Sequence, residues 1–164
     1  MRIVGLDPGL RITGWGIIDI DGNRMRCIAD GAIKTDSKRP LAERLVQLYE
    51  GIEDVLKRFG PVEAAVEETF VNKNPNSTLK LGQARGVVML TPARAGLSVF
   101  EYTPNQVKKT VVGSGHAQKE QVQMMVKTLL PTAKIEIADA ADALAVAICH
   151  AHNRNTPDKW GGVA

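Results

Sequence analysis

The fold of this 164-residue chain is decided by its first apolar stretch, IVGLDPG at residues 3–9. The apolar run predicts a strand, and the Asp-Pro-Gly sequence that follows is a turn signal. Alternation around Trp15 and Ile17 predicts a second strand, and Asp21-Gly22-Asn23 predicts the hairpin turn after it. A third strand is expected over 25–33, so the chain begins as an antiparallel meander.

Beyond the meander, helical and strand patterns alternate. Apolar residues at three- and four-residue spacing predict a helix that Pro40 opens and Gly60-Pro61 stops. Strands are expected over 62–67 and 97–102, and further helices over 79–90, from Pro104, over 119–130 and over 139–152, with a polar loop at 72–77. This order predicts an α/β fold, with a five-stranded mixed sheet (three antiparallel strands, then two parallel) flanked by helices.

Length and composition bound the remaining possibilities. A hydrophobic fraction of 44% and a charged fraction of 24% exclude disordered, collagen-like and coiled-coil chains. We expect a single domain over 1–153 and a flexible tail over 154–164. No apolar run reaches the ~18 residues of a membrane helix, so no membrane partner is expected. The strand-like start and two distant cysteines, expected to be reduced, favour the cytoplasm.

The net charge of +3 is unevenly distributed along the chain. Residues 69–134 contain nine Lys and Arg against two Glu and carry +7, whereas the remainder carries −4. A basic middle segment favours a polyanionic partner such as nucleic acid. A solvated lysine face is an alternative that charge alone leaves open. His150 and His152 are expected to be helix-terminal charges.

Four acids lie in apolar stretches of the sequence. Asp7 ends the first strand and Glu67 ends the strand over 62–67, so the two meet at one sheet edge if these strands are neighbours. Asp139 and Asp142 are three residues apart and share one face of the last helix. Taken singly, each has an ordinary explanation: a turn residue, a solvated strand end, or a helix cap and first-turn acid.

Taken together, the four acids predict a metal site. Buried, unpaired carboxylates are costly and repel one another, so they need a counter-charge. Mg²⁺ or Mn²⁺ prefers carboxylate oxygens together with water and substrate phosphate. Two such ions are suited to in-line attack on a phosphodiester bond.

Five blocks of the sequence resemble the bacterial RuvC Holliday junction resolvases. They are GLDPG at 5–9 with Thr13-Gly14, VEETF at 66–70, LKLGQARG at 79–86, QVKKTVVG at 106–113, and DAADALA at 139–145. The resemblance runs from residue 2 to about 152, and the third and fourth blocks are the most specific.

The resemblance implies an RNase H-like fold and a homodimeric endonuclease that uses Mg²⁺, two ions per active site, with Mn²⁺ as a substitute. It implies that two opposite strands of a four-way DNA junction are nicked symmetrically in recombination and repair. The products would carry 5′-phosphate and 3′-hydroxyl ends. The family's catalytic and metal-binding positions fall on Asp7, Glu67, Asp139 and Asp142. The family also implies RuvA and RuvB, a junction-binding protein and a branch-migration motor, as partners.

The resemblance also implies DNA contacts. Lys108 and Lys119 match positions expected to contact phosphates, and Phe70 matches an aromatic wedge expected to stack on a base. Solvated lysines and a core phenylalanine are the alternatives. Weaker candidates for positioning DNA are Lys73, Lys80, Arg85 and Lys109. Two other functions stay open here: an RNase H-like nuclease acting on RNA–DNA hybrid, and a junction-binding protein without catalysis.

Overall fold

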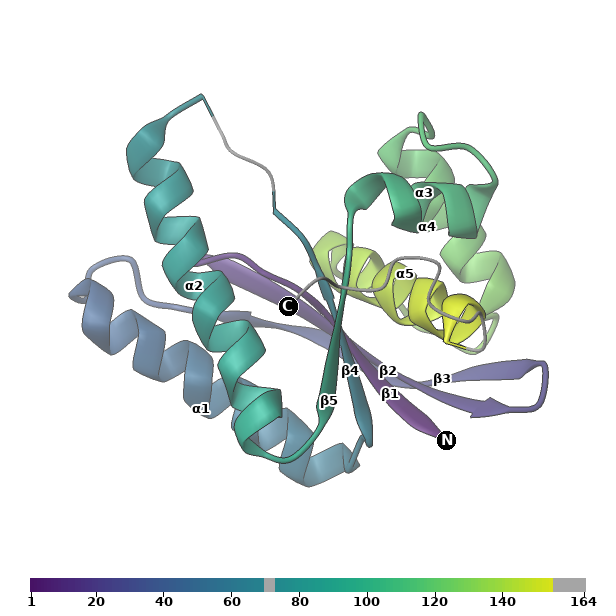
Figure 1. Cartoon of the computed structure of the whole chain (residues 1–164), viewed down its shortest axis with the longest axis horizontal. Helices are drawn as coiled ribbons and strands as arrows, with labels where there is room; N and C mark the ends of the chain where they lie inside the picture. Colours follow the sequence, from purple (N-terminus) through teal and green to yellow (C-terminus); the bar gives the residue numbers. More distant parts are fainter. Residues whose placement is uncertain (70–72, 155–164) are drawn as a thin grey trace, which may run out of the picture.

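A computed structural model describes residues 1–69 and 73–154, which form a five-stranded sheet between two sets of helices (Figure 1). The strands are β1 (Arg2–Asp7), β2 (Ile12–Asp21), β3 (Arg24–Lys34), β4 (Glu63–Glu67) and β5 (Ser98–Tyr102). Their order is β3-β2-β1-β4-β5, with β1 antiparallel to β2 and parallel to β4. β4 is in turn parallel to β5, so the predicted mixed sheet is confirmed.

The helices lie on both faces of the sheet. Helices α1 (Leu41–Phe59) and α2 (Pro75–Arg94) cover one face, while α5 (Ala138–Asn153) covers the other (Figure 1). Helices α3 (Pro104–Val112) and α4 (Lys119–Leu129) pack on α5. The prediction of a loop over 72–77 is wrong from Pro75 onward, because α2 begins at that residue. The Asn74 side chain caps α2 by accepting hydrogen bonds from two backbone amides, and Pro75 takes the first helical position.

The alternation of side chains along the strands determines which acids face α5. Ile3 packs in the core beneath α5, whereas Val4 and Leu6 pack in the core beneath α1 and α2. In β4, Ala65 packs on the α5 side and Val66 on the opposite side. Because successive strand residues point to opposite faces, Asp7 and Glu67 both lie on the α5 face, as does Glu63.

The cysteines, the helices and the C-terminal tail are the subject of further predictions. Cys27 and Cys149 are both free. Within residues 1–69 and 73–154, no helix combines the length and the apolarity needed to cross a membrane. The predicted tail lies outside the described residues beyond Arg154, so the domain boundary at 153 stays a prediction.

A buried histidine lies at the end of α5 far from Asp139. The His150 side chain is fully buried, which corrects the expectation of a helix-terminal charge. Its Nδ1 is 2.7 Å from the Tyr102 hydroxyl, and its Nε2 is 2.8 Å from Oε2 of Glu63. Burial lowers the pKa of His150 below its usual 6.5, although Glu63 opposes the shift. The neutral imidazole therefore ties α5 to β4 and β5.

This burial predicts a pH dependence of stability. Between the lowered pKa and 6.5 the unfolded chain binds more protons than the folded one, so the free energy of unfolding falls as pH falls through this window. Chemical denaturation from pH 8 to pH 5.5 measures it. His150→Gln should be less stable at pH 8 but have a flatter pH profile. A wild-type protein that gains stability relative to this variant on acidification would instead indicate an imidazolium–carboxylate pair.

Candidate active site

Two partly buried carboxyl groups form the floor of the candidate site. Asp7 and Glu67 end two neighbouring parallel strands, and their side chains are hydrogen-bonded to each other. Burial, reinforced by the nearby Glu67, raises the pKa of Asp7 to about 9. Asp142 and Asp139 on the first turns of α5 raise it further, which places all four predicted acids in one electrostatic cluster. The raised pKa of Asp7 favours a proton shared between the two carboxyl groups.

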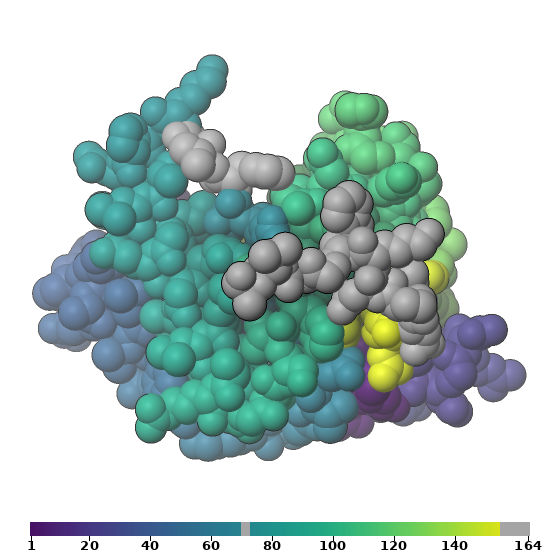
Figure 2. Space-filling view, viewed as in Figure 1, coloured from purple at the N-terminus to yellow at the C-terminus, as the bar shows by residue number. Residues whose placement is uncertain are grey.

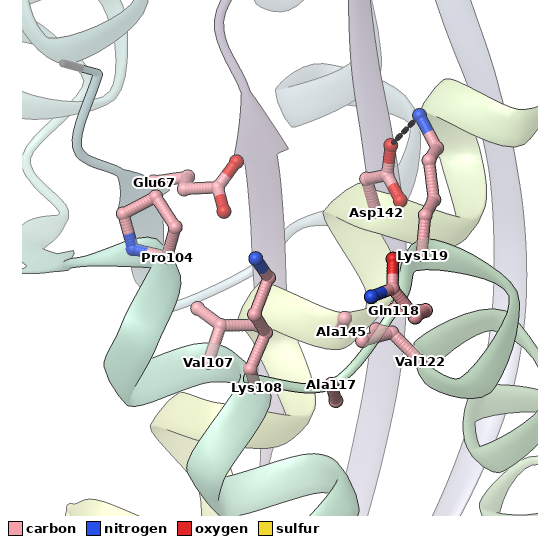
Figure 3. Close-up of a pocket in the computed structure, with 10 residues that line it drawn as sticks. All are labelled: Glu67, Pro104, Val107, Lys108, Ala117, Gln118, Lys119, Val122, Asp142 and Ala145. Atoms are coloured by element: carbon pink, nitrogen blue, oxygen red, sulfur yellow. Dashed lines mark ion pairs between the residues drawn. The ribbon is translucent and has the colours of Figure 1, made fainter. Parts of the chain in front are cut away.

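Two lysines face this cluster. Burial also raises the pKa of Glu67, but Lys108 and Lys119 oppose the shift. The ammonium of Lys108 points toward the Glu67 carboxylate (Figure 3). Nζ of Lys119 lies 2.9 Å from Oδ2 of Asp142, and this hydrogen bond raises the pKa of Lys119. Helix α3 supplies one lysine and α4 the other, so the acids are flanked by positive charge.

The acids and lysines open into a groove of about 430 Å³. The surface is hollowed between the start of α2 and the lobe formed by α3 and α4 (Figure 2). The groove is half polar and half apolar, and its lining consists of Glu67, Pro104, Val107, Lys108, Ala117, Gln118, Lys119, Val122, Asp142 and Ala145 (Figure 3). A charged strand of nucleic acid fits such a groove better than a compact apolar ligand does.

The donor set fits a hard divalent cation. The four carboxyl groups offer oxygen ligands, which Mg²⁺ and Mn²⁺ prefer. Across the described part of the chain, however, no three acidic, histidine or cysteine side chains are grouped closely enough to hold a metal as they stand. The Asp142 carboxylate forms an ion pair with Lys119, and the Asp7 carboxyl group is hydrogen-bonded to Glu67. Metal binding therefore requires Asp142 to exchange its ammonium partner and Asp7 to lose its proton.

Comparison with known protein families gives a match over most of the chain. The model of the crossover junction endodeoxyribonuclease RuvC family matches residues 3–150. This chain belongs to the RuvC family. The RuvC of Rhodospirillum rubrum is 67% identical over 154 residues, which cover 94% of this chain and 91% of that relative. The expected endonuclease class is confirmed, and the nucleases of the RuvC family are metal-dependent.

Solved RuvC structures have the same fold. The Thermus thermophilus RuvC structure is 35% identical and covers 94% of this chain and 95% of its own, with a TM-score of 0.85. A T. thermophilus RuvC in complex with a Holliday junction substrate is 36% identical, with coverages of 92% and 93% and the same TM-score. The RNase H-like arrangement of strands and helices expected from the resemblance is confirmed.

The remaining predicted DNA contacts are dispersed. Lys73 is exposed just before α2, Lys80 is exposed in the first half of α2, and Lys109 lines a separate depression beside Thr110. Arg85 forms an ion pair with Glu101 on β5 and is not among the residues that line the groove. Phe70 lies outside the described residues. Among the predicted DNA contacts that the structure describes, only Lys108 and Lys119 lie at the acids.

Sequence reasoning missed the glycine on which α5 rests. Gly14 pairs with Asp7 in the β1–β2 ladder and lies directly beneath the backbone of Asp139. The available signal was the alternation of Gly14 and Gly16 with bulky residues in a strand, which marks close approach of another backbone.

Lys119→Gln is expected to lower the cleavage rate roughly 10²-fold, because it removes the positive charge that faces the acids and the scissile phosphate. Junction binding should weaken far less, since binding rests on many phosphate contacts. Lys127→Gln is the matched control, an exposed lysine two turns further along α4. Single-turnover cleavage and gel-shift binding separate the two effects. Equal losses in both variants would reduce Lys119 to one of many phosphate contacts.

Proposed function

We propose that this chain resolves four-way DNA junctions as a metal-dependent endonuclease whose metal is held by Asp7, Glu67, Asp139 and Asp142. The observation that carries the proposal is the electrostatic cluster formed by Asp7 and Glu67 at one sheet edge with Asp139 and Asp142 on the first turns of α5. Glu67 and Asp142 line a groove that also contains Lys108 and Lys119. A protein that only binds DNA gains nothing from four clustered acids beside phosphates. This argues against a junction-binding protein without catalysis.

The chemistry follows from the roles of these side chains. Mg²⁺, with two ions per site and Mn²⁺ as a substitute, would supply an activated water and stabilise the leaving 3′ oxygen when bound. The four carboxylates would hold and orient the metal ions. Asp142 would become free to do so when Lys119 leaves it for a phosphate. Lys108 and Lys119 offset the negative charge that develops on the scissile phosphate. Cleavage then leaves the 5′-phosphate and 3′-hydroxyl ends expected from the resemblance.

Other residues are proposed to position the DNA. The exposed Lys73, Lys80 and Lys109 would contact phosphates away from the scissile bond. The ion pair with Glu101 makes Arg85 the weakest of these candidates. Phe70 follows Glu67 by three residues and is proposed to stack on an unpaired base at the junction centre.

A homodimer would place two active sites on one junction. One face of α2 carries Leu79 and Leu90, which are 64% and 61% exposed. Gly82 and Gly86 lie between them, and a Cβ added to either would meet nothing within 4 Å. This apolar and small-residue face favours close antiparallel packing of two copies of α2 about a twofold axis. RuvA and RuvB as partners, and the cytoplasm as location, stay predictions.

Substrate comparison tests the proposal. The protein with Mg²⁺ should nick a synthetic four-way junction and leave an RNA–DNA hybrid and linear duplex of the same sequence intact. Binding to the junction should weaken steeply as salt rises, because phosphate contacts release counterions. Preferential cleavage of the hybrid would favour the RNase H-like alternative over junction resolution.

A further inference from the structure

Helix α5 rests on a track of glycines. It packs against β1 and β2, and Gly5, Gly14 and Gly16 all lie beneath it. A Cβ built on Gly14 would lie 2.0 Å from the carbonyl oxygen of Asp139 and 2.5 Å from its carbonyl carbon. A Cβ on Gly16 would instead meet the Leu144 side chain, at 2.5 Å from Cδ2 and 2.6 Å from Cγ, and would reach the backbone nitrogen of Leu144 only at 3.2 Å.

The Asp139 backbone above Gly14 and the Leu144 side chain above Gly16 differ in how easily they can move. Real Cβ atoms essentially never approach another heavy atom within 3.0 Å, so something must move in both cases. The Leu144 side chain can change rotamer, whereas the backbone of Asp139 cannot move without the first turn of α5. An alanine at position 14 would therefore lift that turn by about 1 Å or more.

The strand beneath Gly14 cannot retreat instead. Gly14 is paired with Asp7 in the ladder, and the preceding Thr13 is fully buried. The Thr13 hydroxyl donates to the carbonyl of Gly9 at 2.7 Å and accepts from the Gly9 amide at 3.2 Å. These two hydrogen bonds hold the start of β2 against the turn that follows Asp7. The movable partner is thus the first turn of α5.

We infer that Gly14 is a positioning residue that sets the distance between Asp7 on β1 and the two acids on α5. The inference rests on the proposed function, in which these acids hold metal. Mg²⁺ demands near-ideal octahedral geometry, and a displacement of ~1 Å in a catalytic group can cost about 10²-fold in rate. Gly14 pairs with Asp7 on β1 and lies beneath Asp139 on α5, so its lack of a side chain sets how closely these two elements approach.

The test compares Gly14→Ala with Gly16→Ala, the matched control beneath the same helix. Gly14→Ala should bind junction normally in chelator and remain folded, but require at least 10-fold more Mg²⁺ for half-maximal cleavage. Its rate at saturating Mg²⁺ should fall about 10²-fold. Calorimetric titration with Mn²⁺ alone should show the same weakening without DNA. Gly16→Ala should lower the Tm without shifting the metal midpoint.

A second variant tests the same distance from the α5 side, alone and in the Gly14→Ala background. Asp139→Glu lengthens the carboxylate arm by one methylene on an unshifted helix, and should weaken Mn²⁺ binding on its own. In the Gly14→Ala background the longer arm should restore part of the lost affinity. Full Mn²⁺ affinity in Asp139→Glu, no recovery in the double variant, or an equal midpoint shift in Gly16→Ala would each overturn the positioning role. If wild-type protein itself neither binds Mn²⁺ nor nicks junctions, the proposed function fails instead.

Discussion

Replacing Asp7 with asparagine is expected to abolish junction cleavage while leaving junction binding intact. The variant removes one oxygen ligand from the cluster, and loss of one such preorganised group costs roughly 10²–10³-fold or more. It should not destabilise the metal-free protein. Burial raises the pKa of Asp7 to about 9, so asparagine replaces a carboxyl group that is already neutral at pH 7. Single-turnover cleavage, gel-shift binding and thermal unfolding measure the three effects.

Asp30→Asn is the matched control for this variant. Asp30 is another partly buried acid whose pKa burial raises, but it lies on β3 near Cys27 and Glu136. Its variant should cleave at the wild-type rate. Cleavage retained in Asp7→Asn, or lost equally in Asp30→Asn, would contradict the assignment of the site.

A charge placed on the exposed face of α2 that carries Leu79 and Leu90 is expected to abolish paired cleavage by separating the proposed dimer. Leu90→Glu puts a carboxylate on a side chain that is 61% exposed in the single chain. In a twofold interface the substitution occurs twice, and juxtaposed like charges cost several kcal/mol. The variant should be monomeric by light scattering and nick one strand without its opposite partner.

Met124→Glu provides the control for the dimer face. Met124 on α4 is 63% exposed, so it matches Leu90 in exposure and chemistry but lies on a different surface. Its variant should elute as the wild-type dimer and make paired nicks. A Leu90→Glu protein that stays dimeric would move the interface away from this face of α2.

The sheet was predictable because local patterns specify it. The apolar run at residues 3–6, the Asp21-Gly22-Asn23 turn and the spacing of α1 each act within a few residues. The four acids were predictable for the same reason, since each ends a strand or shares a helix face. The start of α2 was missed, although Asn74-Pro75 has the chemistry of a helix cap followed by a first-turn proline.

Other features depend on contacts between distant segments and could not be predicted. The burial of His150 requires β4 and β5 to bring Glu63 and Tyr102 to it. The pairing of Lys119 with Asp142 depends on how α4 packs on α5. The proposed role of Gly14 depends on the packing of α5, because the lack of a side chain matters only where another backbone approaches closely.

The central claim is that the acid cluster cuts junction DNA with metal, and mapping nicks on a mobile four-way junction tests it most directly. Each strand is labelled in turn, and the reaction is run with Mg²⁺ and with chelator. Mg²⁺-dependent nicks are expected at symmetric positions in two opposite strands, with 5′-phosphate and 3′-hydroxyl ends. Nicks that persist in chelator, or that fall at unrelated positions in the two strands, would contradict it.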